Sequence, residues 1–186
     1  TYFVCQHDSW KKALQDVFKD SLAGYDRVLF DSKSLSMEHI ESLMKPIEEG
    51  YAIKRIDEES YKTDELLRDD LGRRFFQNPG FLESGFGYGL YEGKTMIGFV
   101  ATNFPMDTLE AEVYIRIDYN DNPIHRGRGF GLQLALYFLK ESLEKGYDPV
   151  WDSANDISAN LALKLGYTIR QKWVVYHVRT NPLLSR

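Results

Sequence analysis

A glycine-rich segment, Arg126-Gly127-Arg128-Gly129-Phe130-Gly131, constrains this chain more than any other feature. In the residues before it, apolar and polar side chains alternate, which predicts a half-buried strand over residues 111–119. In the residues after it, apolar side chains recur at helical spacing: Leu132, Ala135, Leu136, Leu139 and Leu143. Gly146 is placed to end that helix in a left-handed C-cap. The sequence therefore predicts a strand, a glycine loop and a long amphipathic helix in succession.

A loop of this kind is suited to binding an anion. It presents free backbone N–H groups at the positive end of a helix dipole, and phosphate is the natural ligand. Glycine allows the backbone to approach the ligand closely, and Arg126 and Arg128 add charge-assisted hydrogen bonds. A Walker loop is excluded because it ends in Gly-Lys-Ser/Thr, and a dinucleotide fingerprint is excluded by its glycine spacing. Taken alone, the segment is equally compatible with a plain helix start carrying solvated arginines.

Composition narrows the class of protein. The 186 residues are 43% hydrophobic and 14% aromatic, enough for one domain with a partial second. The net charge of -5 and the lack of a basic, aromatic cluster argue against nucleic acid and favour a cationic small molecule. No apolar run predicts a membrane span or a signal peptide. A lone Cys5 and the absence of zinc-ligand spacing predict no metal and suit the cytoplasm. The chain begins at Thr1, without methionine, so we treat a longer parent protein as open.

The rest of the chain reads as strands alternating with helices. Before Gly50 we expect a helix over 10–22, a strand at 28–30, and a helix from an N-cap at Ser36 toward Glu49. The later elements are a strand over 51–56, a helix over about 61–71, strands flanking the turn 92–94, a strand near 150–151, a helix over 156–165, and strand-like runs at 167–169 and 173–178. The pattern of residues along the chain changes at Gly50. We therefore predict an α/β fold with an N-terminal extension or partial domain over 1–50 and a main domain over 51–186.

Two motifs together resemble a known superfamily. Arg126, Gly129 and Gly131 match the Gln/Arg-x-x-Gly-x-Gly/Ala signature of the GNAT acyltransferases. A second signature places an Asn eleven residues before the glycine of a Leu-Gly-Phe/Tyr ending, and Asn155 with Leu165-Gly166-Tyr167 matches it. The chain thus resembles GNAT N-acetyltransferases over about 51–178. The resemblance implies the GNAT fold, a mixed central sheet flanked by helices, here with an added N-terminal α/β segment, and it implies acetyl-CoA as the co-substrate.

The resemblance also implies where coenzyme A binds. The segment Arg126, Gly127, Arg128, Gly129, Phe130 and Gly131 would hold the pyrophosphate, and Asn155 with Ser158 would lie along the pantetheine. In the family the central strand separates from its neighbour, and its exposed backbone groups hold the pantetheine and polarise the thioester carbonyl. In this chain Tyr119, Asn120 and Asp121 would supply those backbone contacts.

The catalytic groups are less well marked. Many members carry a tyrosine seven residues after the Asn, proposed to protonate the leaving thiolate, and that position is Ala162 here. Ser158, Tyr167, another tyrosine or water are the substitutes that we consider. Candidates for the base, acting directly or through water, are Glu112, Tyr114 and Asp118, with ordinary solvent-facing residues as the alternative. We interpret His125 as a packing or phosphate-side residue.

Two further segments bear on the acceptor. Acidic residues crowd 57–70, where they could attract an amine, although a solvated helix face is the favoured interpretation. Gly85-Phe86-Gly87-Tyr88-Gly89 precedes a strand, so it predicts close backbone approach and not a phosphate loop. Its aromatics, with Trp151-Asp152 and 155–160, resemble more weakly the zwittermicin A resistance acetyltransferases, which carry an added N-terminal region.

The expected function is acetyl transfer from acetyl-CoA to an amine of a small molecule, by direct attack in a ternary complex. Two alternatives stay open at this point. One is a protein or peptide amine as the acceptor, and the other is a non-catalytic acyl-CoA-binding module, which Ala162 supports. A homodimer is compatible with the sequence, which does not identify the acceptor.

Overall fold

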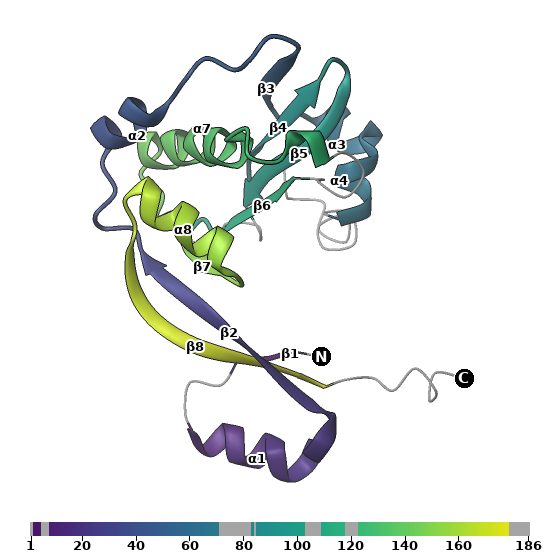
Figure 1. Ribbon diagram of the computed structural model, residues 1–186, viewed down its shortest axis with the longest axis vertical. Coiled ribbons are helices and arrows are strands. Elements are labelled where there is room, and N and C mark those ends of the chain that lie inside the picture. The colour runs from purple at the N-terminus through teal and green to yellow at the C-terminus, as the bar shows by residue number, and fades with distance from the viewer. Residues whose placement is uncertain are drawn as a thin grey trace.

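A computed structural model describes residues 2–4, 8–70, 83, 85–102, 109–117 and 123–178 of the chain. Its elements in chain order are β1 (Tyr2–Val4), α1 (Asp8–Phe18), η1 (Lys19–Ser21), β2 (Leu22–Asp31), α2 (Met37–Leu43), β3 (Tyr51–Arg55), α3 (Glu58–Thr63), α4 (Glu65–Asp70), β4 (Gly87–Glu92), β5 (Thr95–Thr102), β6 (Val113–Ile117), η2 (Pro123–His125), α7 (Phe130–Glu144), β7 (Trp151–Ser153), α8 (Asp156–Leu165) and β8 (Thr168–Val178). Strands and helices alternate through most of the chain, as the predicted α/β class requires (Figure 1).

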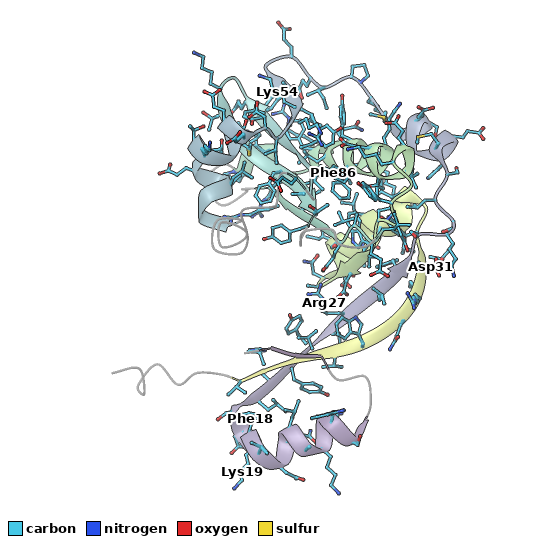
Figure 2. All side chains as sticks on the ribbon, turned by 180° about the vertical axis from the view of Figure 1, so that it is seen from behind. Phe18, Lys19, Arg27, Asp31, Lys54 and Phe86 are labelled. Carbon is cyan, nitrogen blue, oxygen red and sulfur yellow. The ribbon has the colours of Figure 1, made fainter. Side chains whose placement is uncertain are left out.

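The strands form two sheets, ordered β3-β4-β5-β6 and β1-β8-β2-β7. The paired strands within each sheet run antiparallel. Helix α7 packs on one face of the first sheet, and its residues Leu134, Phe138 and Leu139 are fully buried in the main core. Figure 2 shows Phe86 inside this body, and its ring stacks on Phe138 with centroids 4.7 Å apart.

A smaller core lies on the other face of the first sheet. There Leu67 of α4 is buried with Ile56 and Phe99, and Tyr114 of β6 packs against them. Val113, Ile115 and Ile117 of β6 instead pack against the main core. The predicted alternation of this strand is therefore confirmed, because Tyr114 and its odd-numbered neighbours pack against different cores.

The N-terminal extension supplies an interior strand of the second sheet. Strand β2 pairs with β8 from Leu22 opposite Val178 to Asp31 opposite Thr168, and with β7 through Val28 opposite Ser153. The far halves of β2 and β8 project from the body as an arm that ends at α1 (Figure 1), and Arg27 lies where the arm meets the body (Figure 2). The division of the chain at Gly50 stays a prediction.

Several predicted boundaries are wrong, and local chemistry explains two of them. The helix begun by Ser36 ends at Leu43 and not near Glu49, because Met44 is extended and Pro46 cannot continue a helix. The helix expected over 61–71 is two short helices, since Asp57 caps α3 and Asp64 interrupts it by accepting from the backbone N–H of Leu66 at 3.0 Å.

The remaining differences come from pairing between distant strands. The strand at 28–30 extends over Leu22–Asp31, and the runs at 167–169 and 173–178 are one strand, β8, because the two lie side by side over their length. The apolar face expected on the first helix is mostly exposed to solvent. Leu14 is 7% exposed, whereas Trp10 and Val17 are 62% and 70% exposed.

The other predicted elements agree with the structure. Helices α7 and α8, strands β3 to β7 and the turn at Gly93 lie where the pattern placed them. The close backbone approach predicted at 85–89 is also confirmed, because a Cβ on Gly87 would lie 2.6 Å from the carbonyl oxygen of Val100. Only glycine fits there, and β4 can therefore pair tightly with β5.

Candidate functional site

The glycine loop forms the entrance to α7. Gly127 and Gly129 have φ angles of 74° and 78°, in the left-handed region that glycine adopts without strain. Gly129 is the N-cap of α7, and none of the side chains that the structure describes caps the helix there. Within the described part of the chain, the first backbone N–H groups of this 15-residue helix are thus left to a ligand or to water. This geometry is that of an anion-binding site.

The two arginines of the loop differ in their surroundings. Arg126 is exposed. Arg128 is packed instead: its guanidinium lies over the Tyr51 ring, 4.5 Å from the centroid, donates to the Tyr51 hydroxyl at 2.6 Å, and pairs with Glu48. The ion pair with Glu48 and the hydrogen bond to Tyr51 hold the pKa of Arg128 above its ordinary value. Arg126 is therefore the more accessible of the two cations.

An aromatic and acidic cluster supports the loop from behind. His125 is 1% exposed and packs edge-on against Tyr51, with ring centroids 5.8 Å apart, and its Nε2 lies 3.4 Å from a carboxylate oxygen of Glu92. Tyr51 donates to Glu92 at 2.8 Å. The packing interpretation of His125 is confirmed. Sequence reasoning missed Glu48, Tyr51 and Glu92, which no local motif marks, because only the fold brings β3, the residues before it and β4 to the loop.

The strand before the loop separates from its neighbour. The segments 109–113 and 148–150 run parallel and exchange four backbone hydrogen bonds of 2.7–3.1 Å, the last from the N–H of Val113 to the carbonyl of Val150. Beyond Val113, β6 is the edge strand of one sheet, while β7 continues at the edge of the other. A diverging edge beside an uncapped helix start offers backbone groups to an extended ligand.

The start of α8 directly follows β7, one of the two strands that diverge. The side-chain oxygen of Asn155 caps the helix by accepting from the N–H of Ser158 at 2.9 Å. The hydroxyl of Ser158 accepts from the indole N–H of Trp151 at 3.0 Å. With its oxygen used in the cap, Asn155 presents its amide N–H groups as donors. The two predicted coenzyme-binding residues therefore belong to one capped turn.

The predicted base candidates are only partly brought together. Tyr114 is half-buried on the α4 face of the first sheet, with its ring centroid 5.8 Å from that of Phe99, and Glu112 is half-buried just before β6. Asp118, Tyr119, Asn120 and Asp121 lie outside the described residues. Of the three candidates, the structure thus places Glu112 and Tyr114 on the strand that separates from its neighbour.

The position of the family's usual acid, Ala162, and one of the substitutes considered for it, Tyr167, are fixed in the core. Ala162 is fully buried in the main cluster, so no hydroxyl is supplied from that position. Tyr167 is 2% exposed and its hydroxyl donates to the carbonyl of Pro149 at 2.8 Å. Burial raises the pKa of Tyr167 well above its ordinary value. Tyr167 is therefore committed to packing, and Ser158 is the named candidate that remains near the open end of α8.

The described part of the chain shows neither a metal site nor a membrane-spanning helix. Its His, Cys, Asp and Glu side chains do not gather in any group of three able to hold a metal ion. None of its helices is long and apolar enough to cross a membrane.

Comparison with protein families decides the assignment. The GNAT acetyltransferase family model matches residues 1–176. The chain belongs to the GNAT acetyltransferase family. Because the match starts at residue 1, the N-terminal extension is part of the family pattern, whereas the motif resemblance began near residue 51. Members of this family transfer acyl groups from acyl-CoA, generally acetyl-CoA, and this chain is an acetyltransferase.

Solved structures share the fold. A GCN5-related N-acetyltransferase-like protein from Streptococcus suis superposes with a TM-score of 0.83 at 22% identity, over 96% of this chain and 71% of that one. A tandem GNAT protein from the clavulanic acid biosynthesis pathway gives 0.61 at 14% identity, over 97% and 63%. A putative GNAT acetyltransferase from Novosphingobium aromaticivorans gives 0.56 at 15% identity, over 87% and 69%. A search of curated protein sequences gives no match. The chain thus spans between 63% and 71% of the length of these three structural neighbours.

Proposed function

We propose that this GNAT acetyltransferase moves an acetyl group from acetyl-CoA to an amine of a small molecule, by direct attack in a ternary complex. The observation that carries the proposal is the uncapped start of α7 at the point where β6 leaves the side of β7. An anion site for the pyrophosphate and an unpaired strand edge for the pantetheine then lie next to each other.

The reaction places specific demands on this chain. The amine nitrogen forms a bond to the thioester carbon, the carbon–sulfur bond breaks, the amine loses a proton and the thiolate gains one. Backbone N–H groups at the edge of β6 would stabilise the developing oxyanion. Glu112, Tyr114 or Asp118 would accept the amine proton directly or through water, and Ser158 or water would return a proton to the thiolate. Acetyl-CoA supplies the activated acetyl group.

The proposed class of acceptor, a cationic amine, follows from the negative charge of the protein. The net charge of -5 and the exposed acids of α3, Glu58 and Glu59, favour a cationic amine near the α4 face, where Tyr114 also lies. A peptide amine is the competing outcome. The homodimer and a cytoplasmic location stay predictions.

Thiol release tests the activity. Free coenzyme A is followed while the protein is incubated with acetyl-CoA and a panel of small amines, polyamines and peptides. Turnover with small amines supports the proposal, and turnover confined to peptides refutes the acceptor class.

The matched variants are Arg126→Ala and Arg170→Ala, the second removing an exposed arginine of β8. Loss of one charge-assisted contact to phosphate should weaken acetyl-CoA binding by about tenfold in titration calorimetry. Arg170→Ala should bind as the parent does. Equal acetyl-CoA affinities for the parent protein and both variants would show that the glycine loop is not part of the coenzyme site.

A further inference from the structure

Arg27 links the N-terminal extension to β7, the strand that separates from β6. It lies on β2 where the arm meets the body (Figure 2), and its side chain is 20% exposed. Its Nε donates to a carboxylate oxygen of Asp152 at 2.8 Å, and its Nη2 donates to the backbone carbonyl of the same residue at 2.7 Å. A single side chain of the extension therefore bonds both the side chain and the main chain of a residue in β7.

The backbone of β7 shows which way the carbonyl of Asp152 points. Val150 directs both of its backbone groups toward the segment that leads into β6. Its N–H donates to the carbonyl of Ala111 at 3.1 Å, and its carbonyl accepts from the N–H of Val113 at 2.9 Å. In a strand the backbone groups of successive residues point to opposite edges, so residues two apart share an edge. The carbonyl of Asp152 therefore points toward β6, as that of Val150 does.

Strand β6 carries the donor that would match this carbonyl. The N–H of Ile115 points to the same edge as that of Val113, two residues earlier. If the parallel ladder continued, Ile115 would donate to Asp152. Among the described residues the ladder ends at Val113, and the carbonyl of Asp152 accepts from Arg27 instead. A shielded carbonyl without a partner costs free energy, so Arg27 removes a penalty that opposes the separation of the two strands.

Neighbouring contacts hold the Arg27 side chain in this position. The indole N–H of Trp173 in β8 donates to the other carboxylate oxygen of Asp152 at 3.3 Å, which fixes the carboxylate. That carboxylate, 12% exposed, then fixes the Nε of Arg27 in an ion pair. A guanidinium holds its donors in a rigid planar fork, so the bond from Nε aims Nη2 at the carbonyl. The three strands of the second sheet therefore act together on the edge of β7 that faces β6.

We propose that Arg27 is a positioning residue for acetyl transfer, which holds β7 apart from β6 and keeps the N–H of Ile115 available to the coenzyme. The inference rests on the proposed function, because that function assigns the edge of β6 to the pantetheine and the oxyanion. Without Arg27, the carbonyl of Asp152 would take the N–H of Ile115, since both groups are more stable when paired. The strands would then close over the edge that the thioester needs. The N-terminal extension thus serves the reaction without touching the substrate.

Amide hydrogen exchange of the ligand-free protein tests the inference. In the parent protein Ile115 should exchange faster than Tyr114 and Arg116, whose N–H groups point toward β5. In Arg27→Met, which keeps an apolar stem and loses the donors, exchange at Ile115 should slow by about tenfold or more as the amide gains a partner. Arg170→Met, which alters an exposed arginine of β8, should leave this exchange unchanged. Unchanged exchange at Ile115 in Arg27→Met would refute the inference.

Arg27→Lys separates the ion pair from the bond to the carbonyl, and it keeps the test available if the methionine variant does not fold. Lysine retains the charge beside the carboxylate of Asp152 but lacks the fork that reaches both groups. Exchange at Ile115 should therefore slow in Arg27→Lys as well. Exchange as fast as in the parent protein would show that the ion pair alone positions β7, and the inference would fail.

Steady-state kinetics connects the position of β7 to the reaction. With acetyl-CoA and an amine that the parent protein acetylates, Arg27→Lys should lower kcat by about a hundredfold, the effect of withdrawing one oxyanion donor. Its calorimetric affinity for coenzyme A should fall less than kcat does, because the start of α7 is unaltered. Slowed exchange with an unchanged kcat would refute the role in the reaction. If the parent protein acetylates no amine, the proposed function fails, and the exchange measurements still decide whether Arg27 holds the strands apart.

Discussion

Among the carboxylates that the structure describes, Glu141 of α7 has the most strongly shifted pKa, and its partners are well defined. Its side chain is 10% exposed and accepts from Arg55 at 3.0 Å, from Lys145 at 2.6 Å and from the Tyr88 hydroxyl at 2.6 Å. Burial raises the pKa of Glu141, but these hydrogen bonds outweigh it and lower the pKa from 4.5 to about 2. The charged form is therefore the form that the fold stabilises.

This shift predicts how stability depends on pH. A fall from 4.5 to about 2 corresponds to about 3 kcal/mol, at about 1.4 kcal/mol for each pH unit. Because the folded pKa is the lower one, this stabilisation is complete above about pH 5 and is lost as the pH falls toward about 2. At about pH 3 the carboxyl is mostly protonated in the unfolded chain but still mostly charged in the folded protein. About 1 kcal/mol of the stabilisation then remains.

Urea denaturation of the parent protein and of Glu141→Gln measures the effect. The variant should lose about 3 kcal/mol of unfolding free energy near pH 7 and only about 1 kcal/mol near pH 3. Glu144→Gln, an exposed neighbour on the same helix, should change stability by less than about 0.5 kcal/mol at either pH. An equal loss for Glu141→Gln at both pH values would show that packing, and not its charge, carries the contribution.

Two further predictions concern packing and the start of α8. Phe86→Ala should cost about 3–5 kcal/mol in urea denaturation, since the ring is 2% exposed and stacks on Phe138, whereas Ile169→Ala, 51% exposed, should cost less than about 1 kcal/mol. Asn155→Ala should cost about 1 kcal/mol through loss of the cap, and Asn155→Asp should keep the cap while raising the KM for acetyl-CoA. If the KM for acetyl-CoA is unchanged in Asn155→Asp, Asn155 caps α8 but does not contact the coenzyme.

Local sequence determined the elements that depend on neighbouring residues. The N-caps Ser36 and Asn155 each accept from a backbone N–H three residues ahead, and the glycines around α7 sit where a left-handed backbone is needed. Periodicity placed α7 and α8 because an amphipathic helix carries its own 3.6-residue pattern. The same reasoning predicted an anion site at Gly129, since a loop and a helix start need no distant partner to form one.

Only the tertiary structure decided what distant segments do to each other. Strand β2 lies between β7 and β8 because its backbone pairs with residues more than a hundred positions away, and no local pattern specifies that partner. The glycine loop shows the same limit. The sequence made Arg126 and Arg128 equivalent, but in the fold Glu48 and Tyr51 contact Arg128. Charge and glycine spacing are local properties, whereas the neighbour of a charge is set by the fold.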